Sequence, residues 1–82
     1  MADERTEVLD AIRTRAASLT GKDASEFSAD TAFKDLQLKS VQYSQLTTYL
    51  EDEFDVEVPY MTFRRKETFG DAADYVVELL DM

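Results

Sequence analysis

Ser40 is the residue of this chain whose type and position are best suited to carry chemistry. It stands where a polar loop ends and a strongly periodic apolar run begins. A serine at the start of a helix lies beside unpaired backbone N–H groups and the positive end of the helix dipole. A phosphate joined to its oxygen would be stabilised there. The position therefore predicts either an ordinary helix cap or a serine that holds a phosphate group.

The composition of the 82-residue chain restricts other kinds of chemistry. It has no cysteine, which excludes disulfides, thiolate metal sites and cysteine nucleophiles. It also has no histidine, the commonest general base and metal ligand. The acidic run 51–57 lacks the glycine and the spacing of a calcium loop, and no pair of carboxylates has evident catalytic spacing. We therefore expect neither an enzyme nor a dedicated metal site.

The formal net charge of −9 narrows the range of partners. Such a chain is repelled by nucleic-acid phosphates and anionic lipid headgroups, whereas proteins with basic patches attract it. No apolar run is long enough to span a bilayer, and the N-terminus lacks the apolar core of a signal peptide. We expect a cytoplasmic monomer that binds neither nucleic acid nor membrane.

Apolar residues recur at helical spacing in three long segments, separated by Gly21 and Pro59, which end helices. A variant capping box at Thr68–Asp71 opens the last of them. The expected helices are Asp3–Ser18, Ser40–Phe54, a short one within Tyr60–Lys66, and one that follows Thr68 and runs through Leu80.

The connection from Thr20 to Lys39 is long for a small domain, and loops of this length are functional or held by their own apolar residues. Asp30 and Thr31 are candidates to start a short helical turn within it. Together these elements predict one domain, residues 1–82, that is an all-α bundle of three main helices and one short helix, with a long loop after the first. The expected apolar anchors of the loop are Phe27, Ala32, Phe33, Leu36 and Leu38.

The order of motifs along the chain resembles the acyl carrier protein family. Its members carry Phe-x-x-Leu-Gly-x-Asp-Ser-Leu before the second helix and an acidic-Phe segment at that helix's end. A hydrophobic-acidic-hydrophobic-Pro turn and Thr-x-Gly-Asp follow. The resemblance covers almost the whole chain and favours attachment at Ser40 over an ordinary cap. The matching residues are Phe33, Leu36, Leu38 and Ser40, then Leu46, Leu50 and Glu51–Phe54, then Val56–Pro59, then Thr68–Ala72.

The resemblance implies a carrier and not an enzyme. A phosphopantetheinyl transferase would join 4′-phosphopantetheine to Ser40 through a phosphodiester, and acyl-loading and acyl-transfer enzymes would then use its thiol. The sulfur belongs to the cofactor, so a chain without cysteine can hold thioesters. The second helix would present the recognition surface, and the third would border a cargo cleft whose candidate residues are Leu46, Leu50 and Phe63.

The chain departs from the family pattern around Ser40. Gln37 replaces the usual glycine, and Lys39 replaces the aspartate before the serine. The stretch Leu36–Leu50 contains one cation and no anion, a net charge of about +1. The basic cluster Arg64–Lys66 is either a solvated turn or a surface that selects other partners. The candidate partner-binding residues are Lys39, Val41, Gln45, Glu51, Asp52, Arg64 and Arg65.

These departures favour a specialised carrier for a lipid, cell-envelope or polyketide pathway. Hydroxyls at Ser44, Thr47 and Thr48 favour a short or polar cargo if they face inward. The segment Phe54–Pro59, with Phe63 and Arg65 beyond it, also resembles aminoacyl carriers of the D-alanyl type, which is the alternative within the class. From another class, an unmodified acidic helical interaction module remains the competing interpretation.

Overall fold

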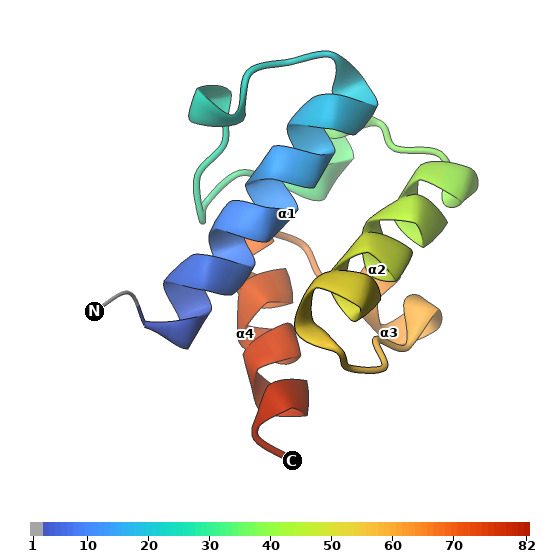
Figure 1. Ribbon diagram of the computed structural model, residues 1–82. Helices are drawn as coiled ribbons and strands as arrows, with labels where there is room; N and C mark the ends of the chain where they lie inside the picture. Colours follow the sequence, from blue (N-terminus) through green and yellow to red (C-terminus); the bar gives the residue numbers. More distant parts are fainter. Residues whose placement is uncertain (1–2) are drawn as a thin grey trace.

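Three long helices form the frame of the structure, a computed structural model that describes residues 3–82 (Figure 1). They are α1 (Glu4–Thr20), α2 (Ser40–Phe54) and α4 (Phe69–Leu80). The remaining elements are the short α3 (Tyr60–Arg64) and two 3₁₀ turns, η1 (Ala24–Glu26) and η2 (Phe33–Leu36), in the loop after α1. No strand is formed between residues 3 and 82. The all-α expectation is confirmed, and residues 1–2 of the expected domain lie outside the described range.

Local hydrogen bonds explain where the helices begin and end. The carboxylate of Asp3 accepts the Thr6 amide at 2.7 Å and caps α1. The helix ends at Gly21, whose φ of 73° is the left-handed conformation that glycine adopts without strain. At α4, the Thr68 hydroxyl accepts the Asp71 amide at 3.1 Å. Gly21 therefore ends the first helix as predicted, although α1 continues past Ser18 to Thr20.

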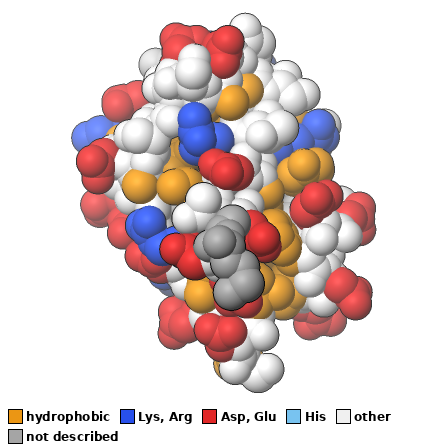
Figure 2. Space-filling view, turned by 60° about the vertical axis from the view of Figure 1, so that its left-hand side comes forward, with side chains coloured by type: hydrophobic (Ala, Val, Ile, Leu, Met, Phe, Trp, Pro, Cys, Tyr) orange, Lys and Arg blue, Asp and Glu red, His pale blue; other side chains and the backbone are white. Residues whose placement is uncertain are grey.

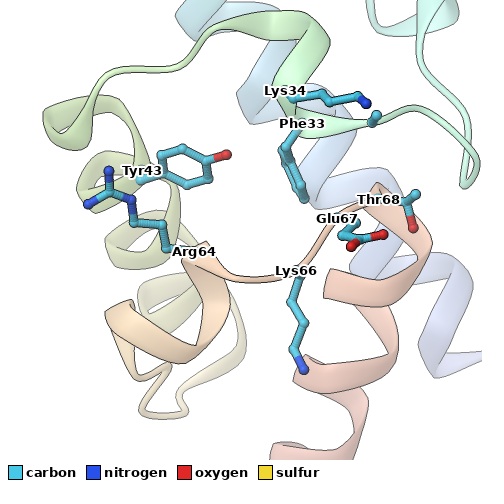
Figure 3. A pocket seen from close by; sticks show the side chains of 8 residues that line it. Phe33, Lys34, Tyr43, Arg64, Lys66, Glu67 and Thr68 are labelled. Carbon is cyan, nitrogen blue, oxygen red and sulfur yellow. The ribbon is translucent and has the colours of Figure 1, made fainter.

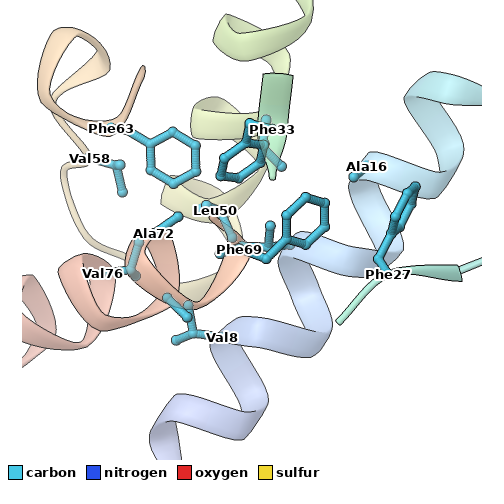
Figure 4. Close-up of a cluster of buried hydrophobic side chains, with 13 residues drawn as sticks. Val8, Ala16, Phe27, Phe33, Leu50, Val58, Phe63, Phe69, Ala72 and Val76 are labelled. Atoms are coloured by element: carbon cyan, nitrogen blue, oxygen red, sulfur yellow. The ribbon is translucent and has the colours of Figure 1, made fainter. Parts of the chain in front are cut away.

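The apolar faces of the long helices meet in one core (Figure 4). α1 packs against both α2 and α4. Burying these side chains supplies the main drive for folding, because each large one contributes about 1.5–3 kcal/mol. The helical residues that are fully buried are Val8, Ile12, Ala16, Leu46, Leu50, Phe63, Phe69, Ala72, Ala73 and Val76.

Two aromatic side chains of the long loop enter this core. Phe33 stacks on Phe69 with ring centroids 4.6 Å apart, and it lies 6.0 Å from Phe63 and 5.9 Å from Tyr43. Phe27 packs 5.2 Å from Phe69 (Figure 4). One loop residue thus joins α2, α3 and α4, which confirms the anchoring expected of Phe27 and Phe33.

Polar contacts hold the rest of the loop. The Arg13 guanidinium donates from Nε to the Phe27 carbonyl at 2.8 Å and from Nη2 to the Ala24 carbonyl at 3.0 Å. The expected helical turn at Asp30 is wrong, because residues 29–30 form a turn closed by the Thr31 amide on the Ser28 carbonyl. The helical turns are η1 and η2 instead.

A short antiparallel bridge joins the loop to the start of α4. Ala32 pairs with Thr68, the Phe33 amide donates to the Glu67 carbonyl at 2.9 Å, and the Phe69 amide donates to the Thr31 carbonyl at 3.0 Å. The bridge places η2 beside the segment 64–68.

Carboxylates are spread over the face shown in Figure 2, with apolar side chains visible between them. None of the helices described between residues 3 and 82 is both long and apolar enough to cross a bilayer.

Candidate functional site

Ser40 is exposed and is the first residue of α2. It is not the helix cap that the sequence allowed. Lys39 takes the cap position, and its backbone N–H donates to the Gln42 side-chain oxygen at 2.8 Å. The Ser40 hydroxyl makes no hydrogen bond within residues 3–82. It is therefore free to be modified.

The backbone around Ser40 suits an attached phosphate. The Lys39 carbonyl accepts the amides of Gln42 at 2.9 Å and Tyr43 at 3.0 Å. The amides of Ser40 and Val41 have no acceptor within the described part of the chain. These two donors lie at the positive end of the α2 dipole, so a phosphodiester on Ser40 would meet both free N–H groups and a favourable field.

Two hydrogen bonds fix the start of α2. The Gln42 side-chain amide donates to the Leu19 carbonyl at the end of α1, at 3.2 Å. The Tyr60 hydroxyl donates to the Ser40 carbonyl at 3.3 Å and so joins α3 to α2. The sequence analysis predicted neither role. The place of Gln42 three residues after Lys39 was the available signal for the first.

Gln37 has φ 52° and ψ 44°, the left-handed conformation. The residue type departs from the family pattern, but the backbone conformation is one that glycine adopts most easily. The turn that delivers the chain to Ser40 is therefore formed here by a residue with a side chain.

The predicted partner-binding residues differ in their exposure and are spread along α2 and the end of α3. Glu51 is half-buried, and its carboxylate accepts the Val58 amide at 2.9 Å, so it also holds the turn after α2. Val41 is 59% exposed, as is Met61 on α3, which the sequence reasoning missed. The predicted residues that are exposed are Lys39, Val41, Gln45, Asp52, Arg64 and Arg65.

The predicted cargo-cleft residues Leu46, Leu50 and Phe63 are fully buried in the core. The cavities found within residues 3–82 are lined by other residues, and the cargo-cleft role stays a prediction. Of Ser44, Thr47 and Thr48, whose hydroxyls were considered for the cargo, only Thr47 is buried, and its hydroxyl donates to the Ser44 carbonyl at 3.0 Å. The helix therefore satisfies that hydroxyl by itself.

A cavity of about 410 Å³ opens between η2, α2 and the segment 64–68 (Figure 3). Tyr43, one turn along α2 from Ser40, forms one wall. Burial raises the pKa of the Tyr43 phenol, and the nearby Arg64 opposes that rise. The phenol is thus a neutral O–H donor at physiological pH. The cavity is lined by Ala32, Phe33, Lys34, Tyr43, Arg64, Lys66, Glu67 and Thr68.

The sequence matches a family model over residues 10–76, and the description of that model is "Phosphopantetheine attachment site". The fold is a helical bundle with an exposed serine at the start of a helix. Together with this match, it defines the chain as a phosphopantetheine-bearing carrier domain.

Curated relatives identify the family. The acyl carrier protein of Rubrobacter xylanophilus is 34% identical over 76 residues, covering 92% of this chain and 94% of its own length. That of Streptococcus thermophilus is 38% identical over 58 residues, covering 71% of this chain and 76% of its own. The chain belongs to the acyl carrier protein family. Members are non-catalytic carriers, and the match implies a 4′-phosphopantetheine prosthetic group.

Solved structures share the fold. A free-standing peptidyl carrier protein from an uncharacterized secondary metabolic pathway of Acinetobacter baumannii superposes with a TM-score of 0.81 and 21% identity, covering 92% of this chain and 94% of its own. The HMG-ACPI domain of the CurA module from Lyngbya majuscula gives a TM-score of 0.79 and 19% identity, covering 98% of this chain and 86% of its own. At this level of sequence identity, the structural similarity establishes the helical-bundle fold.

Proposed function

We propose that Ser40 is the attachment point of the 4′-phosphopantetheine arm, and that the chain carries acyl intermediates as thioesters on that arm. The observation that carries this proposal is the exposed, unbonded Ser40 hydroxyl beside the free amides of Ser40 and Val41. When bound, the group supplies the thiol that the chain itself lacks.

The residues of this chain would hold and present the arm. The free amides and the α2 dipole would stabilise the phosphodiester charge. Gln42 and Tyr60, through their bonds to Leu19 and Ser40, would keep the start of α2 fixed against α1 and α3. Because the start of α2 would be held fixed, only the arm itself would move. Partner enzymes would then meet an arm that begins at a defined position on the protein.

The partners we propose are a phosphopantetheinyl transferase and acyl-loading and acyl-transfer enzymes, which bind the exposed surface around Ser40. That surface carries Lys39, Arg64 and Arg65 and no acidic residue from 36 to 50. This charge pattern supports a specialised lipid, cell-envelope or polyketide pathway. We also propose that the carrier works as a monomer in the cytoplasm.

An aminoacyl carrier of the D-alanyl type is the second candidate within the class. The segment Phe54–Pro59, with the buried Phe63 and exposed Arg65 after it, favours this alternative. An unmodified interaction module is the remaining alternative, and it requires no covalent group on Ser40.

Intact-protein mass spectrometry after incubation with coenzyme A and a broad-specificity phosphopantetheinyl transferase tests the attachment. We expect a mass gain of one phosphopantetheine unit. Ser40→Ala should abolish it, while Ser44→Ala, at an exposed serine one turn further along α2, should not. An unmodified wild-type chain, or a modified Ser40→Ala variant, would contradict the proposal and favour the interaction module.

A further inference from the structure

A row of hydroxyl side chains runs along α2 from Ser40. Ser44 and Thr48 stand four and eight residues after it, and residues at this spacing lie on one face of a helix. Both side chains are exposed, and their hydroxyls make no hydrogen bond within residues 3–82. The face of α2 that begins at Ser40 therefore offers uncharged groups that can each donate and accept a hydrogen bond.

These hydroxyl residues line a cavity of about 340 Å³ between α1 and α2, the α1–α2 cavity. The two helices lie side by side, and the start of α2 meets the end of α1, where Gln42 binds the Leu19 carbonyl (Figure 1). Along α2 the lining extends from Val41, next to Ser40, to Asp52, a rise of about 16 Å. The cavity is lined by Arg15, Val41, Ser44, Gln45, Thr48, Tyr49 and Asp52.

Arg15 gives the α1 side of this cavity a cation without a partner. Its Nε is buried and has no acceptor, and the residue belongs to neither of the ion pairs found within residues 3–82. The guanidinium lies 5.6 Å from the centre of the Tyr49 ring, which belongs to the same lining. A guanidinium has five N–H donors and no acceptor, so an occupant with oxygen acceptors would supply the partners that Arg15 lacks.

The charges of the α1–α2 cavity favour an uncharged occupant. Arg15 and Asp52 are its charged residues, and they cancel, although the net charge of the chain is −9. By contrast, the cavity beside Tyr43 has three cations and one carboxylate, and a third cavity, further along α1 and α2, has three carboxylates and no cation. An anion would meet the repulsion of Asp52 and a cation that of Arg15, whereas an amide meets neither.

Arg13 shows how a guanidinium of α1 binds amide carbonyls. Two residues before Arg15, it donates from Nε to the Phe27 carbonyl at 2.8 Å and from Nη2 to the Ala24 carbonyl at 3.0 Å. The 4′-phosphopantetheine arm contains two amide groups, a hydroxyl and a pair of methyl groups beside its phosphate. Arg15 has the same donors as Arg13, so an amide carbonyl of the arm is an acceptor that it can bind.

We propose that the α1–α2 cavity binds the 4′-phosphopantetheine arm while no partner is docked. The inference rests on the proposed attachment at Ser40. Arg15 would donate to an amide carbonyl of the arm, and the Ser44 and Thr48 hydroxyls would bind its amide groups. Val41 would contact the methyl groups. Because the arm is tethered at Ser40, its effective concentration beside the cavity is high, and individually weak hydrogen bonds suffice.

Partner docking would compete with the bound arm. Val41, Gln45 and Asp52 line the α1–α2 cavity and are also predicted partner-binding residues. A partner that covers this face of α2 would take the place of the arm and release it toward the partner's own site. Binding in the α1–α2 cavity would thus couple release of the arm to docking.

NMR of the loaded chain tests the proposal. An isotopically labelled chain would be loaded from unlabelled coenzyme A by a broad-specificity transferase, with loading verified by mass, so that protons of the arm are distinguished from those of the protein. We expect nuclear Overhauser effects from the arm to the Val41 methyl groups and to the Tyr49 ring. Effects confined to the cavity beside Tyr43, or to residues 40–42 alone, would overturn the proposal.

Two variants remove one hydrogen-bonding group each from the cavity. Arg15→Met keeps the apolar stem, and Thr48→Val keeps the side-chain shape. In each, the shift of the Tyr49 amide on loading should fall roughly two- to five-fold. Arg64→Gln, which removes a cation from the cavity beside Tyr43, is the matched control and should keep the full shift.

Shifts of wild-type size in both variants would contradict the proposed hydrogen bonds. The spectrum of each variant before loading shows whether the fold is kept. Thr48 is exposed, so Thr48→Val retains the test if Arg15→Met does not fold.

Salt separates the amide groups of the arm from its phosphodiester. Hydrogen bonds to uncharged amides should survive about 1 M salt, where the Debye length is about 3 Å, whereas an exposed ion pair between Arg15 and the phosphodiester would weaken. Loss of the Tyr49 shift in salt would overturn the assignment to the amide groups. A chain that the transferase does not modify would overturn the attachment at Ser40 instead, and the mass spectrum shows that before any contact is measured.

Discussion

Gln37 places a side chain in a backbone conformation that favours glycine, three residues before Ser40. The left-handed region disfavours L-residues by about 1–2 kcal/mol, because Cβ approaches the carbonyl oxygen. The turn persists because η2 is anchored by the buried Phe33 on one side and α2 is fixed by Gln42 on the other. The packing on both sides therefore holds the turn at Gln37 in place, and the turn tolerates a residue with a strained backbone conformation.

Gln37→Gly should stabilise the protein by about 0.5–1 kcal/mol, since the relief of left-handed strain exceeds the extra chain entropy that glycine loses on folding. The free energy of unfolding in urea measures the change. Gln45→Gly is the matched control, because Gln45 lies in right-handed helix and the same substitution there should destabilise by about 1 kcal/mol. A loss of stability in Gln37→Gly would mean that the side chain is not strained.

The start of α2 at Ser40 was predicted correctly, and of the two interpretations of Ser40 the ordinary cap is excluded by the cap position of Lys39. Serine is a strong cap by residue type, because its hydroxyl accepts an amide two or three residues further along the chain. Here the cap position is one residue earlier, at Lys39, and Ser40 is the first residue inside the helix. A shift of one residue in the start of the helix leaves the serine hydroxyl without the role of a cap.

Among the elements, the loop between α1 and α2 depends on one cation of α1. Arg13 binds the carbonyls of Ala24 and Phe27 and so holds η1 and the residue that packs on Phe69. Arg15, two residues further on, has an Nε that is buried and unpaired within residues 3–82, and its guanidinium lies 5.6 Å from the Tyr49 ring.

Arg13→Met should lower the free energy of unfolding by about 1–3 kcal/mol, because two loop carbonyls lose a charged donor. Arg15→Met keeps the apolar stem and removes an unpaired donor, so it should change stability by less than about 0.5 kcal/mol. Urea unfolding of both variants provides the comparison. Equal losses in the two variants would show that the loop does not depend on the Arg13 hydrogen bonds.

The Asp3 cap of α1 predicts that the stability of the fold depends on pH. The hydrogen bond from the Thr6 amide holds the pKa of the Asp3 carboxyl below its ordinary value. A group whose pKa is lower in the folded state stabilises the fold above its unfolded pKa, and that contribution is lost as the pH falls through the folded pKa.

The stability difference between wild type and Asp3→Asn should therefore shrink as the pH falls below the ordinary range of aspartate. Asparagine still caps the helix but does not titrate. Asp3→Ala should be less stable than Asp3→Asn at every pH, because it lacks the cap. Unfolding curves at several pH values test this. If the difference in free energy of unfolding between wild type and Asp3→Asn does not change with pH, the Asp3 cap is not the origin of any pH dependence of stability.

Helical periodicity predicted the elements well, because each long helix buries one regular face. The second helix was expected at Ser40–Phe54 and lies there. The cavity could not be predicted in the same way. It forms because the bridge between Ala32 and Thr68 brings two irregular segments together, and no periodic pattern records such a pairing. Lys34 and Arg64 are thirty residues apart in the sequence, and both line this cavity.

At the scale of the whole molecule, the net charge differs in sign from the charge of the segment around Ser40. The net charge is −9, yet residues 36–50 contain Lys39 and no acidic residue. Tyr60 at the start of α3 contacts Ser40, and the exposed Arg64 and Arg65 stand at the other end of that short helix. We therefore expect the net charge to steer basic partners over long range and these cations to act at short range.

Reversing one local charge should change partner use without changing the fold. With a phosphopantetheinyl transferase whose carrier-binding face is basic, Arg65→Glu should lower the KM for this chain roughly two- to ten-fold, since a like charge at the docking surface becomes an opposite one. The kcat should stay constant, because we expect Arg65 to act in docking and not in the transfer to the Ser40 hydroxyl, which α2 carries. Arg5→Glu is the matched control, since it alters the net charge equally at the opposite end of α1 from the start of α2. Steady-state transfer rates at low and high salt measure both variants, and the gain should fall as salt screens the surface. An equal fall in KM for both variants would mean that only the total charge matters, and that the cations around Ser40 have no local role in choosing partners.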